Sequence, residues 1–269
     1  MKPMSDVEQK DTVIRRVEQS MEWMFGSDYS VQTLQDSDDT MQHDRLNHRL
    51  VSHELRRQQN LESIIMSAYR KAPGLDLSEQ SIPSINDDWM GRWLRISSDT
   101  HDDYMQSVWA DVLIAETTGP GQFSLSTLDK LSCLRPQDLD LCRRVSRLYF
   151  PTGLLFKLAG GADLDAFGLL SEHIESLKNL DLMWQADDLN VSFLAPTKGL
   201  TLDFTGADLV LRHPERELFT FQTYKLTDAG RELSKLMHDG TVDTDYLGAL
   251  GSFMKNDGYD YRLKIKNLD

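Results

Sequence analysis

The stretch WADVLIAETTGPGQFSLSTLDKLSCL, Trp109 to Leu134, decides the fold of this chain. It ends an amphipathic helix whose apolar residues recur at helical spacing: Tyr104, Val108, Trp109, Val112 and Leu113. Gly119–Gly121 stops that helix, because proline cannot donate to the helix ladder and glycine tolerates a left-handed cap. Phe123 then enters the core, and Ser124 or Ser126 caps a second helix with regularly spaced leucines: Leu125, Leu128, Leu131 and Leu134. The stretch therefore predicts a corner between two packed helices, not a reaction centre.

The charge of the chain bears on the kind of partner it meets. With 29 basic and 43 acidic residues among 269, the net charge is −14. Such a field repels phosphate backbones, whereas proteins that bind nucleic acids usually carry the opposite sign. The balance favours a protein partner and disfavours DNA. The length suits one large or two small domains with a sizeable core.

The sequence also indicates the cellular compartment in which we expect the protein. No uncharged apolar run approaches the roughly 18–20 residues needed to cross a bilayer, and the N-terminus MKPMSDVEQK lacks the apolar centre of a signal peptide. We therefore expect no membrane association. Cys133 and Cys142 fall on what look like adjacent helices, and a pair of reduced thiols in a cytoplasmic protein is the expected state.

The longest helical signal runs from Met41 to Ala72, about 48 Å at 1.5 Å per residue. Its apolar residues lie on a common stripe, but its centre is polar. This pattern predicts a packed C-terminal half and a projecting or paired N-terminal half. We expect the helix to mediate self-association, so a homo-oligomer is a possible state of the protein.

Two groups of residues invite a metal-binding interpretation. His43, His48 and His53 are five residues apart, so neighbouring rings point about 140° away from each other and do not share a ligand set. The acidic linker Ser27–Thr40 lacks the spaced ligands, central glycine and closing glutamate of a calcium loop. We predict no metal and no cofactor. Trp89 and Trp93, one helical turn apart, are expected in the core rather than in a ligand cage.

Two segments together resemble a known family. RRQQNLESIIMSA (Arg56–Ala68) and WADVLIAETTGPGQFSLSTLDKL (Trp109–Leu131) resemble an uncharacterised bacterial domain-of-unknown-function family. Its members pair an R-x-Q-N-I-E-x-I helix with a W-x-x-I-L-A-x-E…P-G-x-F-S-L-x-T-L corner. With YKLTDAGRELSKL near the C-terminus, the likeness spans about residues 40 to 240. A looser similarity links the corner to abortive-infection proteins of phage defence. The family implies no activity and no catalytic residues.

The last third of the chain is similar to a winged-helix module. Strand signals at Leu189–Leu194, Leu200–Phe204, Asp208–Arg212 and Leu218–Leu226 follow a short helix, Ser171–Leu180, and precede Y-x-L-T-x-x-G-x-E-L from Tyr224. The likeness places the helix in the recognition position and makes Asn190–Arg212 an enlarged wing. However, the helix carries Glu172, His173 and Glu175 against Lys178, whereas a DNA-reading helix normally offers Arg, Lys, Asn or Gln.

These observations predict an α+β protein with a mostly helical N-terminal part containing a long helix, followed by a winged-helix-like C-terminal part with an enlarged β-hairpin wing. The expected divisions are an N-terminal helix with an acidic linker (1–40), a helical domain (41–150) and the winged-helix-like domain (151–269).

No catalytic motif is present: the sequence lacks G-x-S-x-G, a P-loop, G-x-G-x-x-G, H-E-x-x-H and C-x-x-C. We therefore expect a non-enzymatic cytoplasmic interaction or regulatory protein acting through protein–protein contacts. A winged-helix DNA-binding regulator and a component of a phage-defence system are the alternatives. The candidate interaction residues are Arg56, Arg57, Asn60, Glu116 and Lys178. Glu116 closes an apolar helix, and Arg135 and Arg143 are its expected ion-pair partners.

Overall fold

A computed structural model of the chain describes residues 14–18, 21, 39–72, 84–158, 164–187 and 189–266. The expected N-terminal helix and acidic linker (1–40) fall largely outside these residues. The described part is an α+β protein, as predicted, with helices gathered towards the N-terminus and two small antiparallel sheets in the C-terminal part. None of the helices in the described ranges combines the length and the apolar character that a membrane span requires.

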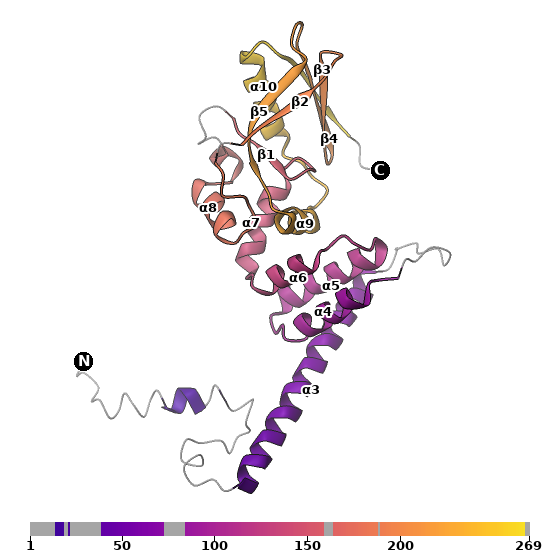
Figure 1. Cartoon of the computed structure of the whole chain (residues 1–269), viewed down its shortest axis with the longest axis vertical. Helices are drawn as coiled ribbons and strands as arrows, with labels where there is room; N and C mark the ends of the chain where they lie inside the picture. Colours follow the sequence, from indigo (N-terminus) through magenta and orange to yellow (C-terminus); the bar gives the residue numbers. More distant parts are fainter. Residues whose placement is uncertain are drawn as a thin grey trace, which may run out of the picture.

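The long helix is α3, Asp39–Lys71. It begins two residues before and ends one residue before the predicted bounds. Its C-terminal half packs against α4 (Asp87–Ser97) and α5 (Asp103–Thr118), while its N-terminal half extends away from these helices (Figure 1). Ile64 and Ala68 are the buried apolar residues of the packed half. The division of this helix into a packed and a projecting half matches the polar centre of its sequence.

The corner forms between α5 and α6, Leu125–Ser132. Side chains cap the first turns: Asp102 accepts a hydrogen bond from the amide of Met105, and Ser124 accepts one from the amide of Thr127. Trp89 and Trp93 are buried, and their indole N–H groups donate to the carbonyls of Phe123 and Trp109, respectively. Both tryptophans therefore belong to the core, as expected, and form no ligand cage.

The next elements build the first sheet. In chain order they are α7 (Pro136–Ser146), β1 (Leu154–Phe156), the 3₁₀ turn η1 (Asp165–Phe167), α8 (Ser171–Asn179), β2 (Leu189–Leu194) and β5 (Leu218–Lys225). The strand order is β1-β5-β2, and both pairings are antiparallel. β5 is the central strand because it pairs with β1 along one edge and with β2 along the other. Its alternate residues face the core and are buried: Phe219, Phe221 and Thr223.

The expected wing is divided between two sheets. β2 stays in the first sheet, whereas β3 (Gly199–Phe204) and β4 (Ala207–Arg212) join β6 (Asp260–Ile265) in a second one, with the order β3-β4-β6. The physical reason is apolar alternation along the hairpin, since Leu202, Phe204, Leu209 and Leu211 are fully buried. Helix α10, Thr244–Asn256, packs against β4 and β6 and so contributes to covering the sheet.

Helix α9, Asp228–Leu236, connects the two parts of the molecule. It begins at the predicted cap, Thr227, and packs against α6 and α7 (Figure 1). Gly230 on its first turn lies so close to the neighbouring segment that an added Cβ would sit 1.9 Å from the carbonyl oxygen of Leu182. A glycine is required here by the close approach of two backbones.

Candidate interaction surfaces

The projecting half of α3 exposes apolar side chains. We call residues 42–57 the α3 arm. Leu46 and Leu50 are 41% and 52% exposed, and they lie on the same stripe as the buried Ile64 and Ala68, because all four are related by helical spacing. The stripe that seats α3 on the body therefore continues into the arm, where its leucines are exposed. Val51 and Leu55, 67% and 58% exposed, form a second ridge on the opposite side of the arm.

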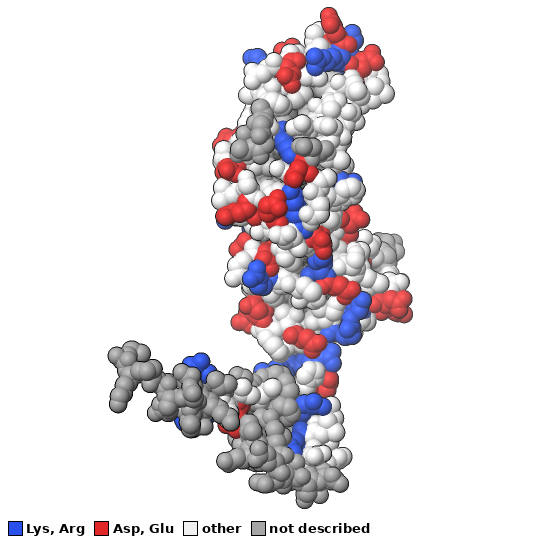
Figure 2. Space-filling view, turned by 60° about the vertical axis from the view of Figure 1, so that its left-hand side comes forward, with Lys and Arg blue, Asp and Glu red and all other residues white. Residues whose placement is uncertain are grey.

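The α3 arm is basic, although the chain as a whole is acidic. It carries four arginines, Arg45, Arg49, Arg56 and Arg57, against two carboxylates, Asp44 and Glu54. In Figure 2 the basic side chains (blue) gather along this half of α3. Over the body above it, acidic side chains (red) are more numerous than the basic ones or are interspersed with them. Arg45 and Arg49 are four residues apart and therefore share one side of the helix, next to Leu46 and Leu50.

At the base of the arm, polar residues join α3 to the body. The guanidinium of Arg57 donates to Ser98 Oγ at 3.1 Å and pairs with Asp99 at 3.0 Å. The amide of Asn60 is buried. It donates to the carbonyl of Ser98 at 2.8 Å, contacts His101 Nδ1 at 2.9 Å and accepts from Gln106 Nε2 at 3.2 Å. Arg57 and Asn60 are thus engaged within the chain, and Arg56 is half-buried beside them.

Glu116 is buried at the end of α5, where it organises the corner. One carboxylate oxygen accepts from the amide of Gly121 at 2.5 Å, and the other accepts from Gln122 at 3.1 Å and Phe123 at 3.2 Å. The expected ion pair is wrong: Arg135 pairs with Asp138, and Arg143 with Asp140. A turn that folds back on its own helix end supplies three amide donors within reach of Glu116, and they satisfy both of its oxygens.

The fourth amide of the same loop binds a different carboxylate. The amide of Ser124 donates to Glu232 Oε2 at 2.9 Å, across from the second turn of α9. Lys235, one turn later on α9, donates to the side-chain oxygen of Gln122 at 3.1 Å. The loop after α5 is therefore held from both sides. The sequence places Glu232 in the Y-x-L-T-x-x-G-x-E-L motif but does not predict its contact with this loop, because its partner is a backbone group remote in the chain.

Lys178 is almost fully buried on α8. Its ammonium donates to Glu175 at 2.8 Å and also to the carboxylate of Asp187. Burial lowers the pKa of Lys178, but the hydrogen bonds to Asp187 and Glu175 outweigh it and raise the pKa above its ordinary value. Lys157 lies nearby, with its Nζ 4.1 Å from the centroid of the Tyr224 ring. Lys178 therefore ties α8 to the following loop and does not project from the recognition position.

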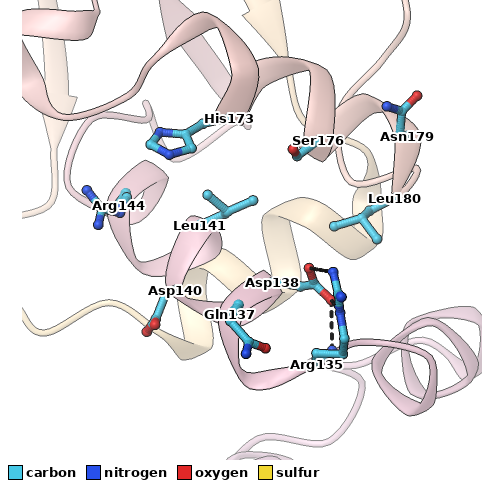
Figure 3. A pocket seen from close by; sticks show the side chains of 10 residues that line it. All are labelled: Arg135, Gln137, Asp138, Asp140, Leu141, Arg144, His173, Ser176, Asn179 and Leu180. Atoms are coloured by element: carbon cyan, nitrogen blue, oxygen red, sulfur yellow. Dashed lines mark hydrogen bonds and ion pairs between the residues drawn. The ribbon is translucent and has the colours of Figure 1, made fainter. Parts of the chain in front are cut away.

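A hollow of about 510 Å³ lies between α7 and α8 (Figure 3). Arg144 from α7 and His173 from α8 face it from opposite walls, and Arg135 lies at one end, bonded to Asp138. Two arginines and two aspartates, Asp138 and Asp140, line the hollow, so their formal charges cancel. Nothing in this lining selects a charged ligand of either sign.

The five candidate residues fall in three separate places. Arg56, Arg57 and Asn60 lie at the base of the arm, Glu116 at the corner and Lys178 in the C-terminal part, so they do not form one site. Among the residues that the structure describes, no three His, Cys, Asp or Glu side chains are grouped so that they could hold a metal ion. The arginines that flank Leu46 and Leu50 were not singled out from the sequence, although the four-residue spacing of Arg45 and Arg49 was visible there.

Comparisons with known proteins identify one family. A family model described as a protein of unknown function (DUF2806) matches residues 44–153 and 155–251. The match covers α3 from residue 44 onwards, the corner, the strands from β1 to β5 apart from residue 154, and most of α10, and it ends before β6. No curated protein and no solved structure matches the chain.

Proposed function

We propose, for a chain that belongs to the DUF2806 family of unknown function, that it is a non-enzymatic interaction or regulatory protein of the cytoplasm. It acts through protein–protein contacts, and the α3 arm is the contact element. The observation that supports this most directly is the exposure of Leu46, Leu50, Val51 and Leu55 on a helix that extends beyond the body. The two free thiols, Cys133 and Cys142, are consistent with a reducing compartment.

An exposed apolar helix is an unusual feature of a protein that acts alone. Single exposed apolar residues are ordinary, whereas several at helical spacing form a stripe that a partner can bury. The arm is long enough for such a contact, because 16 residues of helix extend about 24 Å. The packed half of α3 is anchored through Asn60, Ile64 and Ala68, so the arm is presented from a fixed base.

Site-specific photo-crosslinking tests this proposal in the native host cells. A benzophenone amino acid replaces Leu50 in one full-length variant and the exposed Arg262 of β6 in a control variant. We expect a discrete crosslinked polypeptide from position 50 and none from position 262. Light scattering after size exclusion then tells a second copy of the chain, which would double the mass, from a different protein. The absence of any crosslink at position 50 would remove the arm as a contact element.

A winged-helix DNA-binding regulator is the second candidate. The element order α7, β1, α8, β2, β5 and the strand order β1-β5-β2 favour it, since they correspond to the sheet of a winged helix. The chemistry of α8 does not, because Glu172 and Glu175 are exposed and Lys178 is buried in ion pairs. A gel shift with mixed duplexes at low salt decides this candidate, and no binding there would eliminate it.

A further inference from the structure

We propose that the α3 arm binds an acidic amphipathic helix of a partner protein, which lies along Leu46 and Leu50 and pairs its carboxylates with Arg45 and Arg49. This inference rests on the proposed function and specifies the partner's chemistry. The arm presents an apolar stripe with arginines on one side, and this combination sets both the shape and the charge of the complementary surface.

The positive charge of the arm is a local reversal of the charge of the chain. Four arginines stand against two carboxylates over residues 42–57, and one of these carboxylates, Glu54, is held by Arg57 at 3.2 Å. A leucine stripe flanked by arginines attracts a helix that carries leucines on one face and glutamates or aspartates beside them. A helix with lysines in the flanking positions would place like charges side by side.

A second copy of the chain fits this surface less well. In a parallel pair, the face of α3 that carries Leu46 and Leu50 is already filled by α5 from Asn60 onwards, so the partner's α3 would have to diverge from the arm beyond that point. In an antiparallel pair, the Arg45–Arg49 sides of the two arms run along the same edge, where like charges repel. Both arrangements thus oppose self-association through this stripe, and the acidic heterologous helix meets neither obstacle.

Fluorescence anisotropy with two designed peptides tests the inference. Both are helices of three heptads with leucine at the core positions. One carries glutamate at the flanking positions, and the other carries lysine there. Each peptide is titrated with the full-length protein and with the double variant Arg45→Glu, Arg49→Glu. A second variant, Leu46→Ser with Leu50→Ser, removes the apolar stripe, and Val51→Ser on the opposite ridge is its matched control.

We expect the glutamate peptide to bind the wild-type protein at least about tenfold more tightly than the lysine peptide, and the preference to be reversed in the charge-reversal variant. A reversal cannot come from misfolding, which would only abolish binding. The serine double variant should lose binding and Val51→Ser should keep it.

Equal binding of the two peptides would overturn the inference, as would binding that Val51→Ser abolishes and the serine double variant retains. Vesicles containing anionic lipid that bind as tightly as the glutamate peptide would identify a membrane surface instead. Dimers that the wild-type protein forms and the serine double variant does not would identify a second copy of the chain as the occupant of the stripe instead. If crosslinks form at position 50 but the peptides bind equally well, the α3 arm remains the contact element. Only the proposed acidic character of the partner helix is then wrong.

Discussion

Glu116 on α5 and Glu232 on α9 divide the four consecutive amides of one loop between them: Glu116 binds those of Gly121, Gln122 and Phe123, and Glu232 binds that of Ser124. The loop lies between the helical part of the chain and α9. The two glutamates therefore fix the same turn from opposite sides. The corner is thus stabilised jointly by two helices that are far apart in the sequence.

Glu116→Gln should destabilise the protein by at least about 3 kcal/mol, because hydrogen bonds to a charged acceptor are worth about 1.5–3 kcal/mol each. A carboxamide keeps one acceptor oxygen and turns a donor towards an amide N–H that is also a donor. Urea unfolding followed by circular dichroism measures the change. Glu172→Gln, at an exposed position of α8, is the control and should stay within about 0.5 kcal/mol of wild type. A loss of unfolding free energy below about 1 kcal/mol in Glu116→Gln would mean that the turn is stable without the carboxylate.

Glu232→Ala should cost about 1–2 kcal/mol, since it leaves the Ser124 amide without its carboxylate, while Glu232→Gln should recover most of the loss because it keeps an acceptor. Since both glutamates hold one loop, their effects should be coupled. A double-mutant cycle of Glu116→Gln with Glu232→Ala is expected to give an interaction free energy of at least about 0.5 kcal/mol. Strict additivity would show that each end of the loop folds independently of the other.

Asn60→Leu should destabilise the base of the arm by about 2–3 kcal/mol, because it leaves the Ser98 carbonyl and one bond of Gln106 unsatisfied in a buried place. The matched control is Gln59→Leu on the exposed side of α3, which should change stability by less than about 0.5 kcal/mol. Thermal and urea unfolding of the three proteins provide the comparison. Equal stability of both variants would indicate that Asn60 is not needed to seat α3.

The two cysteines should differ in reactivity. Burial, followed by the charge of Asp138, raises the pKa of Cys142 to about 12, whereas Cys133 is exposed. A thiol reagent at pH 8 should therefore modify one cysteine quickly and the second only on unfolding, since the thiolate is the reactive form. The raised pKa also means that Cys142 contributes full stability below the unfolded-state value of about 8.5 and loses it as the pH rises towards 12. Cys142→Ala should lessen this alkaline loss, and two fast thiols in the native protein would contradict the assignment.

Much of the fold followed from periodicity and caps. The span of α3, the helix starts at Ser124 and Thr227, the burial of Trp89 and Trp93 and the strands β2 to β5 were all predicted within a few residues. These features depend on neighbours in the chain, which a sequence displays directly.

The features that the sequence did not predict depend on contacts between residues that are far apart in the chain. Glu116 was expected to pair with arginines, and it binds backbone amides that carry no sequence signature. The hairpin β3–β4 was expected to be a wing, and it joins β6 from the end of the chain in a separate sheet. Arg57, Asn60 and Lys178 were predicted as interaction residues because they are polar groups in helices. The structure shows that each of them is bonded within the chain.

Two glycines of α10 provide a matched pair for testing how the second sheet is covered. A Cβ added at Gly251 would lie 2.3 Å from the ring of Tyr261 on β6, whereas one added at Gly248 meets nothing within 4 Å. Gly251→Ala should therefore destabilise the protein by at least about 2 kcal/mol, because a well-packed site has no room for an added carbon. Gly248→Ala should stabilise it by about 0.5–1 kcal/mol, since alanine is the better helix former. Urea unfolding of both variants measures the difference, and similar stabilities would show that α10 does not sit against β6 at this distance.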